Sequence, residues 1–65
     1  MENLMCYRGQ PVEVRGHCGE VYWGVIDGMD PRGGIFLRDR FSRRRFIPFF
    51  LIAAIFLLRT RRRIF

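Results

Sequence analysis

Residues 12–39 alternate apolar and polar side chains, and clusters of glycine and aspartate interrupt the alternation. This pattern is typical of short antiparallel strands that are joined by tight turns. It predicts strands over residues 11–16, 20–27 and 35–38, with turns at 16–19 and 28–34. The second of these strands is apolar on both faces, and Gly24 within it would let the strand bend sharply. We therefore expect a curved three-stranded antiparallel meander over residues 11–40.

A run of residues without a charge, 46–58, follows the meander and lies between arginine clusters at 43–45 and 59–63. From residue 49 onwards the run is apolar on every side, and a helix of that kind is either buried or in lipid. Such a helix would rise about 20 Å, which is short of the roughly 30 Å hydrocarbon core of a bilayer. We expect a short apolar helix that spans or lies on a membrane. The alternative is that residues 43–58 supply the fourth and fifth strands of a closed five-stranded barrel.

The chain divides into a leader (1–10), the β meander (11–40), a basic linker (41–45), the apolar segment (46–58) and a basic tail (59–65). The expected fold class is therefore mainly β with one helix, an α+β arrangement. A chain of 65 residues can form one domain at most, and it buries only about 60% of its unfolded surface. We expect added support from a homo-oligomer, a membrane or a partner.

The net charge of +6 is unevenly distributed, because residues 1–37 carry −2 and residues 38–65 carry +8. Such a concentration of positive charge indicates a polyanion or an anionic lipid surface as the partner. All the basic residues are arginines, which either reflects bidentate phosphate contacts or the bias of a GC-rich genome. The residues expected to contact lipid are Arg43, Arg44, Arg45, Phe49, Phe50, Ile52, Ile55, Phe56, Arg59, Arg61, Arg62 and Arg63.

No constellation of residues indicates catalysis. His17, Cys18 and Cys6 could be combined into a metal site only without the Cys-x-x-Cys pairing that zinc sites show, so His17 is expected to be a turn residue. Two cysteines are too few for a disulfide framework, and we expect both to be reduced. The sequence predicts no enzyme activity, no cofactor and no small-molecule substrate.

An apolar outer face is predicted for the meander, made of Trp23, Val25 and Phe36. Two interpretations of this face remain open. Either the tail of the chain covers it, or a partner or second copy of the chain binds there.

The central stretch resembles the first signature of the Sm/LSm (Hfq-like) family of small β-barrel proteins. The matching residues are Val12, Val14, Gly19, Tyr22, Gly24, Ile26, Asp30, Leu37 and Asp39. The second signature departs from the family, since Phe46-Ile47-Pro48 stands where a hydrophobic-Arg-Gly motif is usual. The chain is also similar to short Sm-like proteins of spore-forming bacteria.

The resemblance implies RNA binding as an alternative function. Arg32 stands where the family has an aromatic residue that stacks on a base, and Gly34 stands where it has an asparagine. The residues that the resemblance implies as nucleic-acid contacts are Arg32, Tyr22 and Asp30.

Taken together, the sequence predicts a non-enzymatic, cytoplasmic and membrane-associated protein, built from an Sm-like β module and an arginine-flanked apolar anchor. Two other functions remain open. One is an RNA-binding Sm-like oligomer, and the other is a structural protein of the coat type that assembles through its apolar tail.

Overall fold

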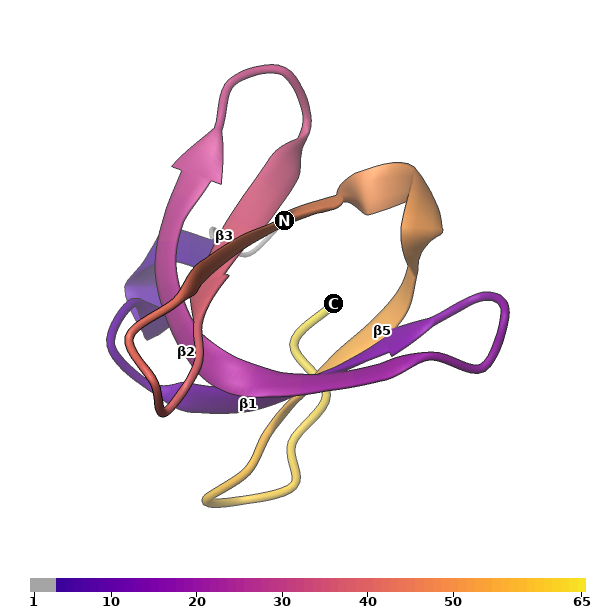
Figure 1. The fold of residues 1–65 in the computed structure, drawn as a ribbon. Helices are drawn as coiled ribbons and strands as arrows, with labels where there is room; N and C mark the ends of the chain where they lie inside the picture. The colour runs from indigo at the N-terminus through magenta and orange to yellow at the C-terminus, as the bar shows by residue number, and fades with distance from the viewer. Residues whose placement is uncertain (1–3) are drawn as a thin grey trace.

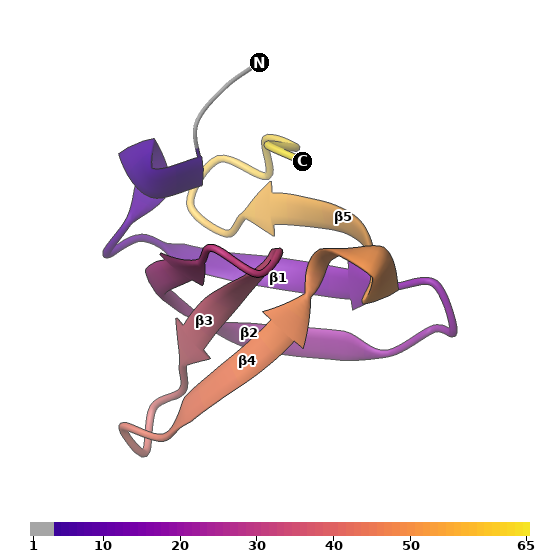
Figure 2. The same cartoon turned by 90° about the horizontal axis from the view of Figure 1, so that it is seen from above.

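The computed structural model describes residues 4–65 as a single antiparallel sheet of five strands (Figure 1). In chain order its elements are η1 (Leu4–Tyr7), β1 (Pro11–Gly16), β2 (Val21–Asp30), β3 (Gly34–Arg38), β4 (Arg44–Pro48), η2 (Phe49–Leu51) and β5 (Ile52–Leu57), where η marks a 3-10 turn. The strand order is β4-β3-β2-β1-β5, and each neighbouring pair is antiparallel. The folded chain measures 24 × 24 × 23 Å, so the sheet curls round on itself instead of lying flat (Figure 2). Residues 1–3 of the predicted leader lie outside the described residues.

The first three strands follow the predicted alternation, with a difference at one turn. β1 has the predicted bounds, while β2 extends three residues beyond the predicted end at residue 27. A bulge between Ile26 and Gly28 shifts the register between β2 and β3, and β2 continues through the first part of the predicted turn. The turn between β2 and β3 is therefore only residues 31–33.

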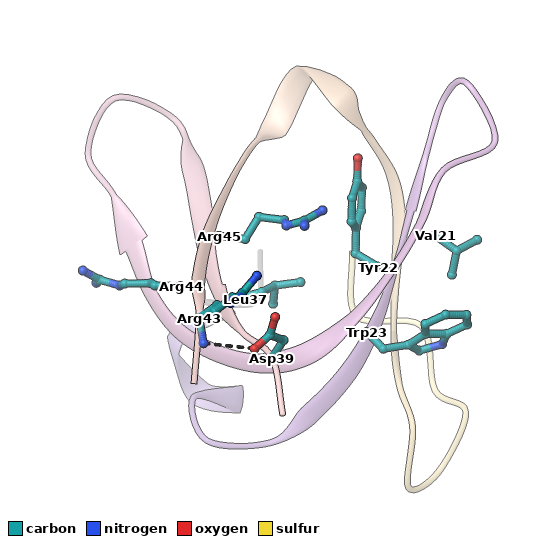
Figure 3. Close-up of a pocket in the computed structure, with 8 residues that line it drawn as sticks. All are labelled: Val21, Tyr22, Trp23, Leu37, Asp39, Arg43, Arg44 and Arg45. Carbon is teal, nitrogen blue, oxygen red and sulfur yellow. Dashed lines mark hydrogen bonds between the residues drawn. The ribbon is translucent and has the colours of Figure 1, made fainter. Parts of the chain in front are cut away.

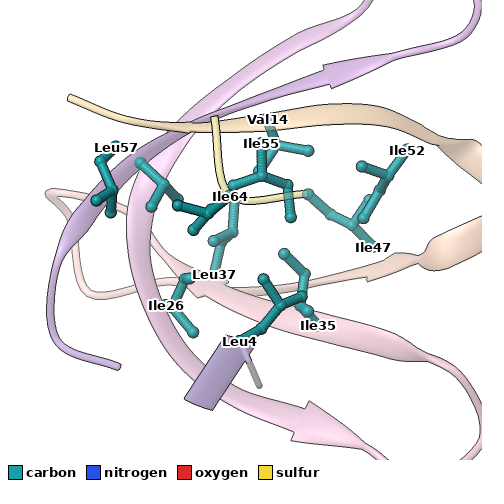
Figure 4. Close-up of a cluster of buried hydrophobic side chains, with 11 residues drawn as sticks. Leu4, Val14, Ile26, Ile35, Leu37, Ile47, Ile52, Ile55, Leu57 and Ile64 are labelled. Atoms are coloured by element: carbon teal, nitrogen blue, oxygen red, sulfur yellow. The ribbon is translucent and has the colours of Figure 1, made fainter. Parts of the chain in front are cut away.

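The core lies on the inner face of the curled sheet, where side chains from all five strands point toward one another (Figure 4). It is aliphatic throughout, and its members are Leu4, Val12, Val14, Ile26, Ile35, Leu37, Ile47, Ile52, Ile55, Leu57 and Ile64. Alternate residues of a strand face opposite sides of the sheet, and the pairs Val12/Val14, Ile35/Leu37 and Ile55/Leu57 follow this spacing. Burial of these side chains is the main stabilising term of the fold.

The predicted helix over residues 46–58 is wrong, and so is the α+β class, because the structure is all-β. The run begins within β4, continues through the single turn η2 and ends with β5. None of the helical segments within residues 4–65 has the length and apolar character that crossing a membrane requires. The physical reason is that the meander leaves its aliphatic face open, and β4 and β5 cover that face. The β-branched side chains of Ile47, Ile52 and Ile55 also favour strands over a helix.

The alternative of a closed five-stranded barrel also differs from the structure, because β4 and β5 are the two edges of an open sheet. The predicted basic tail covers the outer edge of β5. The Ile55 N–H donates to Phe65 O (3.3 Å), and the Ile55 carbonyl accepts from the Ile64 N–H (2.8 Å). The Leu57 N–H donates to Arg62 O (2.8 Å). The tail thus occupies backbone groups that β5 would otherwise offer to another strand.

The turn between β2 and β3 is held by Asp30, which is only 7% exposed. Its carboxylate accepts hydrogen bonds from Arg32 Nη2 (2.7 Å) and from the Arg32 backbone N–H (2.8 Å). The hydrogen bonds from the Arg32 side chain, followed by the one from its backbone, lower the pKa of Asp30 from 3.8 to about 2. Ionised Asp30 therefore stabilises the turn.

The core assignment of the apolar run predicts a contrast between two of its residues. Ile55 is completely buried, whereas Phe50 is 77% exposed. Ile55→Ala should lower the free energy of unfolding by about 2–5 kcal/mol through the cavity it leaves. Phe50→Ala is the matched control and should change it by no more than about 0.5 kcal/mol. Urea unfolding of both variants measures the difference, and equally small effects would contradict the burial of Ile55.

The Asp30–Arg32 pair predicts a pH dependence of stability. Because the pKa of Asp30 is lower in the folded chain than its usual 3.8, its contribution is present above about pH 4 and is lost as the pH falls toward 2. Asp30→Asn should therefore lower the melting temperature near neutral pH, and the gap to the wild type should close between about pH 4 and pH 2. A gap that stays constant over that range would show that the carboxylate is not stabilised in this way.

Candidate functional site

β2 bends strongly along its length (Figure 1), and Gly24 lies where its pairing partner changes. β1 pairs with β2 from Val21 to Val25, and β3 pairs with β2 only from Val25 onwards. A Cβ atom on Gly24 would lie 2.8 Å from the Arg38 carbonyl oxygen, so only glycine allows β3 to approach β2 so closely here. Val25 pairs with Arg38, the last residue of β3, so within residues 4–65 the part of β2 before Val25 has β1 as its one strand partner.

A cavity of about 420 Å³, which we call the arginine cavity, lies beside this part of β2 (Figure 3). Its lining residues are Val21, Tyr22, Trp23, Leu37, Asp39, Arg43, Arg44 and Arg45. The aromatic residues come from β2, and the arginines come from the end of the β3–β4 turn and the start of β4. The turn and the bend together therefore place basic and aromatic side chains around one opening.

The three arginines of this cavity differ in how they are held. Arg44 Nε lies 2.9 Å from Asp27 Oδ2, and its guanidinium covers the ring of Phe36 at 4.1 Å. Arg45 instead packs over the ring of Tyr22, with 5.2 Å from Cζ to the ring centroid. Figure 3 shows Arg45 and Tyr22 extending into the same space while Arg44 points away. Among residues 4–65, neither Arg43 nor Arg45 forms an ion pair, although the charges of both lower the pKa of the nearby Asp39.

Asp39 is the one acidic residue of the arginine cavity, and it organises the turn between β3 and β4. Its Oδ1 accepts hydrogen bonds from the backbone N–H groups of Phe41 (2.8 Å) and Arg43 (2.9 Å). The bond from Arg43, and then the bond from Phe41, lower the pKa of Asp39, although partial burial opposes them. The carboxylate thus serves to fix the turn that carries the basic residues.

A second cavity of about 470 Å³, which we call the tryptophan cavity, adjoins the first. Its lining residues are Pro11, Trp23, Gly24, Val25, Arg38, Asp39, Arg40, Phe41 and Leu58. Trp23 and Asp39 line both cavities, which places the two next to each other along β2. The tryptophan cavity is the more apolar of the two, and its arginines differ from those of the arginine cavity.

Trp23 is held from the neighbouring strand by Glu13. The two residues are direct partners in the register of β1 and β2, and Trp23 Nε1 donates to Glu13 Oε1 at 3.1 Å. The other carboxylate oxygen of Glu13 accepts from Arg15 Nε at 2.7 Å. The hydrogen bond from Arg15, and then the one from Trp23, lower the pKa of Glu13. The indole is therefore fixed at its nitrogen while Trp23 stays 62% exposed.

The residues implied as nucleic-acid contacts do not come together. Tyr22 lines the arginine cavity, but Asp30 and Arg32 bind each other at the β2–β3 turn. That turn lies at the opposite end of β3 from the β3–β4 turn (Figure 1). Sequence reasoning also missed Arg40 and Phe41 as site residues. Their basic and aromatic types were a usable signal, but only the register of β2 with β3 brings them to Trp23.

The residues predicted to contact lipid are dispersed over the molecule. Ile52 and Ile55 are buried in the core, and Phe50 is exposed at η2. Phe49 stacks on the ring of Phe65 with 5.4 Å between centroids, and Arg15 covers Phe56 at 4.9 Å. The exposed arginines of this set fall in two places: Arg43, Arg44 and Arg45 border the arginine cavity, while Arg59, Arg61, Arg62 and Arg63 belong to the tail.

The three residues of the predicted partner surface also differ in their surroundings and exposure. Phe36 is partly buried, with the ring of Phe46 at 5.4 Å and the Arg44 guanidinium above it. Val25 lines the tryptophan cavity, and Trp23 alone remains widely exposed. The tail lies along β5, so it is Arg44 and Phe46 that cover part of this face.

Residues with metal-binding side chains do not cluster. Cys6 and Cys18 are both free and exposed. In the described part of the chain, no group of three or more His, Cys, Asp or Glu residues could hold a metal ion.

The protein was also compared with known proteins, and no protein-family model, curated protein or solved structure matches it.

Proposed function

We propose that the protein binds single-stranded nucleic acid, without catalysis, through the arginine cavity. The observation that carries this proposal is the pair formed by Arg45 and Tyr22, in which a cation without an ion pair lies over an aromatic ring in the cavity lining. Sites for single strands combine positive charge that follows the phosphates with aromatic rings on which bases stack. Arginine suits such a site because its planar guanidinium binds phosphate in a bidentate way and also stacks.

The distribution of charge supports the same partner. Four ion pairs neutralise most of the acidic residues that the structure describes: Glu13–Arg15, Asp27–Arg38, Asp27–Arg44 and Asp30–Arg32. The β3–β4 hairpin retains Arg40, Arg43 and Arg45 without an acidic partner among residues 4–65. A concentration of uncompensated positive charge attracts a polyanion from solution and raises the rate of its association.

RNA is the first ligand to test, because residues 12–39 resemble the Sm/LSm signature. The proposed site shares Tyr22 with the residues that the resemblance implies, but its cations are Arg43 and Arg45 and not Arg32. Membrane association, cytoplasmic location, homo-oligomer formation and coat assembly stay predictions of the sequence. The expected membrane anchor required a helix over residues 46–58, and that segment instead forms strands of the sheet.

The proposal predicts a salt-dependent affinity that two matched variants separate. Binding of a labelled single-stranded RNA, measured by fluorescence anisotropy, should weaken as salt rises, with a slope of about −0.7 per phosphate contact. Arg45→Gln should raise Kd about tenfold, since a hydrogen bond to a charged group contributes about 1.5 kcal/mol. It should also make the slope shallower by about 0.7.

Arg59→Gln is the control for this measurement, because it removes one positive charge from an exposed residue of the tail that lines neither cavity. Its Kd and salt slope should match those of the wild type. Equal effects of the two variants would show that net charge alone governs binding. Absence of RNA binding, together with sedimentation of the protein on vesicles of anionic phospholipid, would overturn the proposal in favour of a lipid surface.

A further inference from the structure

We infer that the tryptophan cavity is a subsite for one unpaired nucleobase, which stacks on the indole of Trp23 while its neighbouring phosphate lies in the arginine cavity. This inference rests on the proposed function and names what the second cavity would recognise. It makes Glu13 a positioning residue, because Glu13 holds the indole through its nitrogen.

The indole is presented as a prepared stacking surface. Trp23 is 62% exposed, although a large aromatic side chain gains most when it is buried. Its one polar atom is already bonded to Glu13, itself only 8% exposed, so the ring is anchored at one edge and the rest stays open. A side chain fixed in this way loses little conformational entropy when a ligand stacks on it.

The cavity beside the indole has the chemistry of a base site. Pro11, Val25, Phe41 and Leu58 give it an apolar lining, and its volume of about 470 Å³ is typical of small-ligand pockets, which span about 300–1,000 Å³. Phe41 is 70% exposed and carries the Arg40 guanidinium at 5.3 Å from its ring centroid. Aromatic rings and arginine guanidinium groups are the side-chain groups on which proteins recurrently stack the bases of single strands.

The position of the second cavity fits one nucleotide. Trp23 and Asp39 line both cavities, so a base in one leaves its phosphate next to the other. The unpaired charges of Arg43 and Arg45 lie in the arginine cavity, where that phosphate would be. Asp39 lies at the same place and its lowered pKa keeps it ionised, so it offsets part of this positive charge, but Arg43 and Arg45 together outweigh it. The apolar tryptophan cavity next to the basic arginine cavity thus matches the base and the phosphate of one nucleotide.

Trp23 is the only tryptophan of the chain, so its fluorescence reports on the proposed contact directly. Titration with single-stranded RNA should quench this fluorescence along the same curve as the anisotropy of the labelled RNA. A strand of the same length without bases, and a duplex of the same sequence, should bind through their phosphates with little quenching. Quenching by the strand without bases would overturn the base subsite.

Variants separate the base subsite from the phosphate site. Trp23→Ala should raise Kd between about 5-fold and 150-fold, which corresponds to about 1–3 kcal/mol per stacked base. Its salt slope should stay that of the wild type, because the arginines are unchanged. Trp23→Phe keeps a ring and should recover part of the affinity, while circular dichroism of both variants establishes that the fold is retained.

Glu13 is tested by its effect on the indole. Glu13→Ala should reduce the quenching at saturating RNA and raise Kd, whereas Glu13→Gln keeps an acceptor for Nε1 and should restore the quenching. RNA binding that is neither quenched nor affected by Trp23→Ala would overturn this inference and leave the proposed function standing. Absence of RNA binding in anisotropy would overturn both.

Discussion

The close approach of β3 to β2 at Gly24 is the constraint on which the surface of this protein depends. A side chain at this position would meet the Arg38 carbonyl oxygen at 2.8 Å, so the glycine is required where the partner of β2 changes from β1 to β3. The first half of β2 pairs with β1 and the second half pairs with β3, and the sheet curls around this strand. Val21 to Trp23, which precede this close approach, have no strand partner on that side among residues 4–65, and the arginine cavity lies there.

The apolar run connects this surface to the stability of the fold. β4 begins with Arg44 and Arg45, and the buried Ile47 lies two residues after Arg45 on the same strand. Residues that line the arginine cavity and a residue of the buried core therefore lie close together on one strand. At the other edge of the sheet, the tail bonds to β5 and buries Ile64. Arginine clusters that flank an apolar run in the sequence thus belong to two different edges.

Some of this structure could be predicted from the sequence. The strand bounds of β1 and the core positions of Val12 and Val14 follow from strict alternation, which is a local property. The β4–η2–β5 segment could not be predicted, because a short run that is apolar on every side fits a helix and a buried strand equally well. Only the open inner face of the meander, a feature of the folded chain, decides between them.

The candidate site, like the fold, could be predicted only in part from the sequence. Aromatic and basic residues were evident, and Tyr22 does lie in a cavity, but the sequence alone did not say which of them meet. Arg32 follows Asp30 by two residues and is bound by it, so a residue that the resemblance implies as a ligand contact is already satisfied within its own turn. The contact between Glu13 and Trp23 depends on the register of two strands. Register is set by turns and by packing across the whole sheet.

The most direct test of this account is an NMR titration of the isotope-labelled protein with single-stranded RNA. Binding at the two cavities should give the largest shifts at the backbone amides of residues 22–24 and 38–45 and at the indole N–H of Trp23, while the signals of the β2–β3 turn and of η2 stay unchanged. Shifts that centre on residues 30–33 instead would contradict it, because they would place the ligand at the opposite end of β3 from the bend at Gly24.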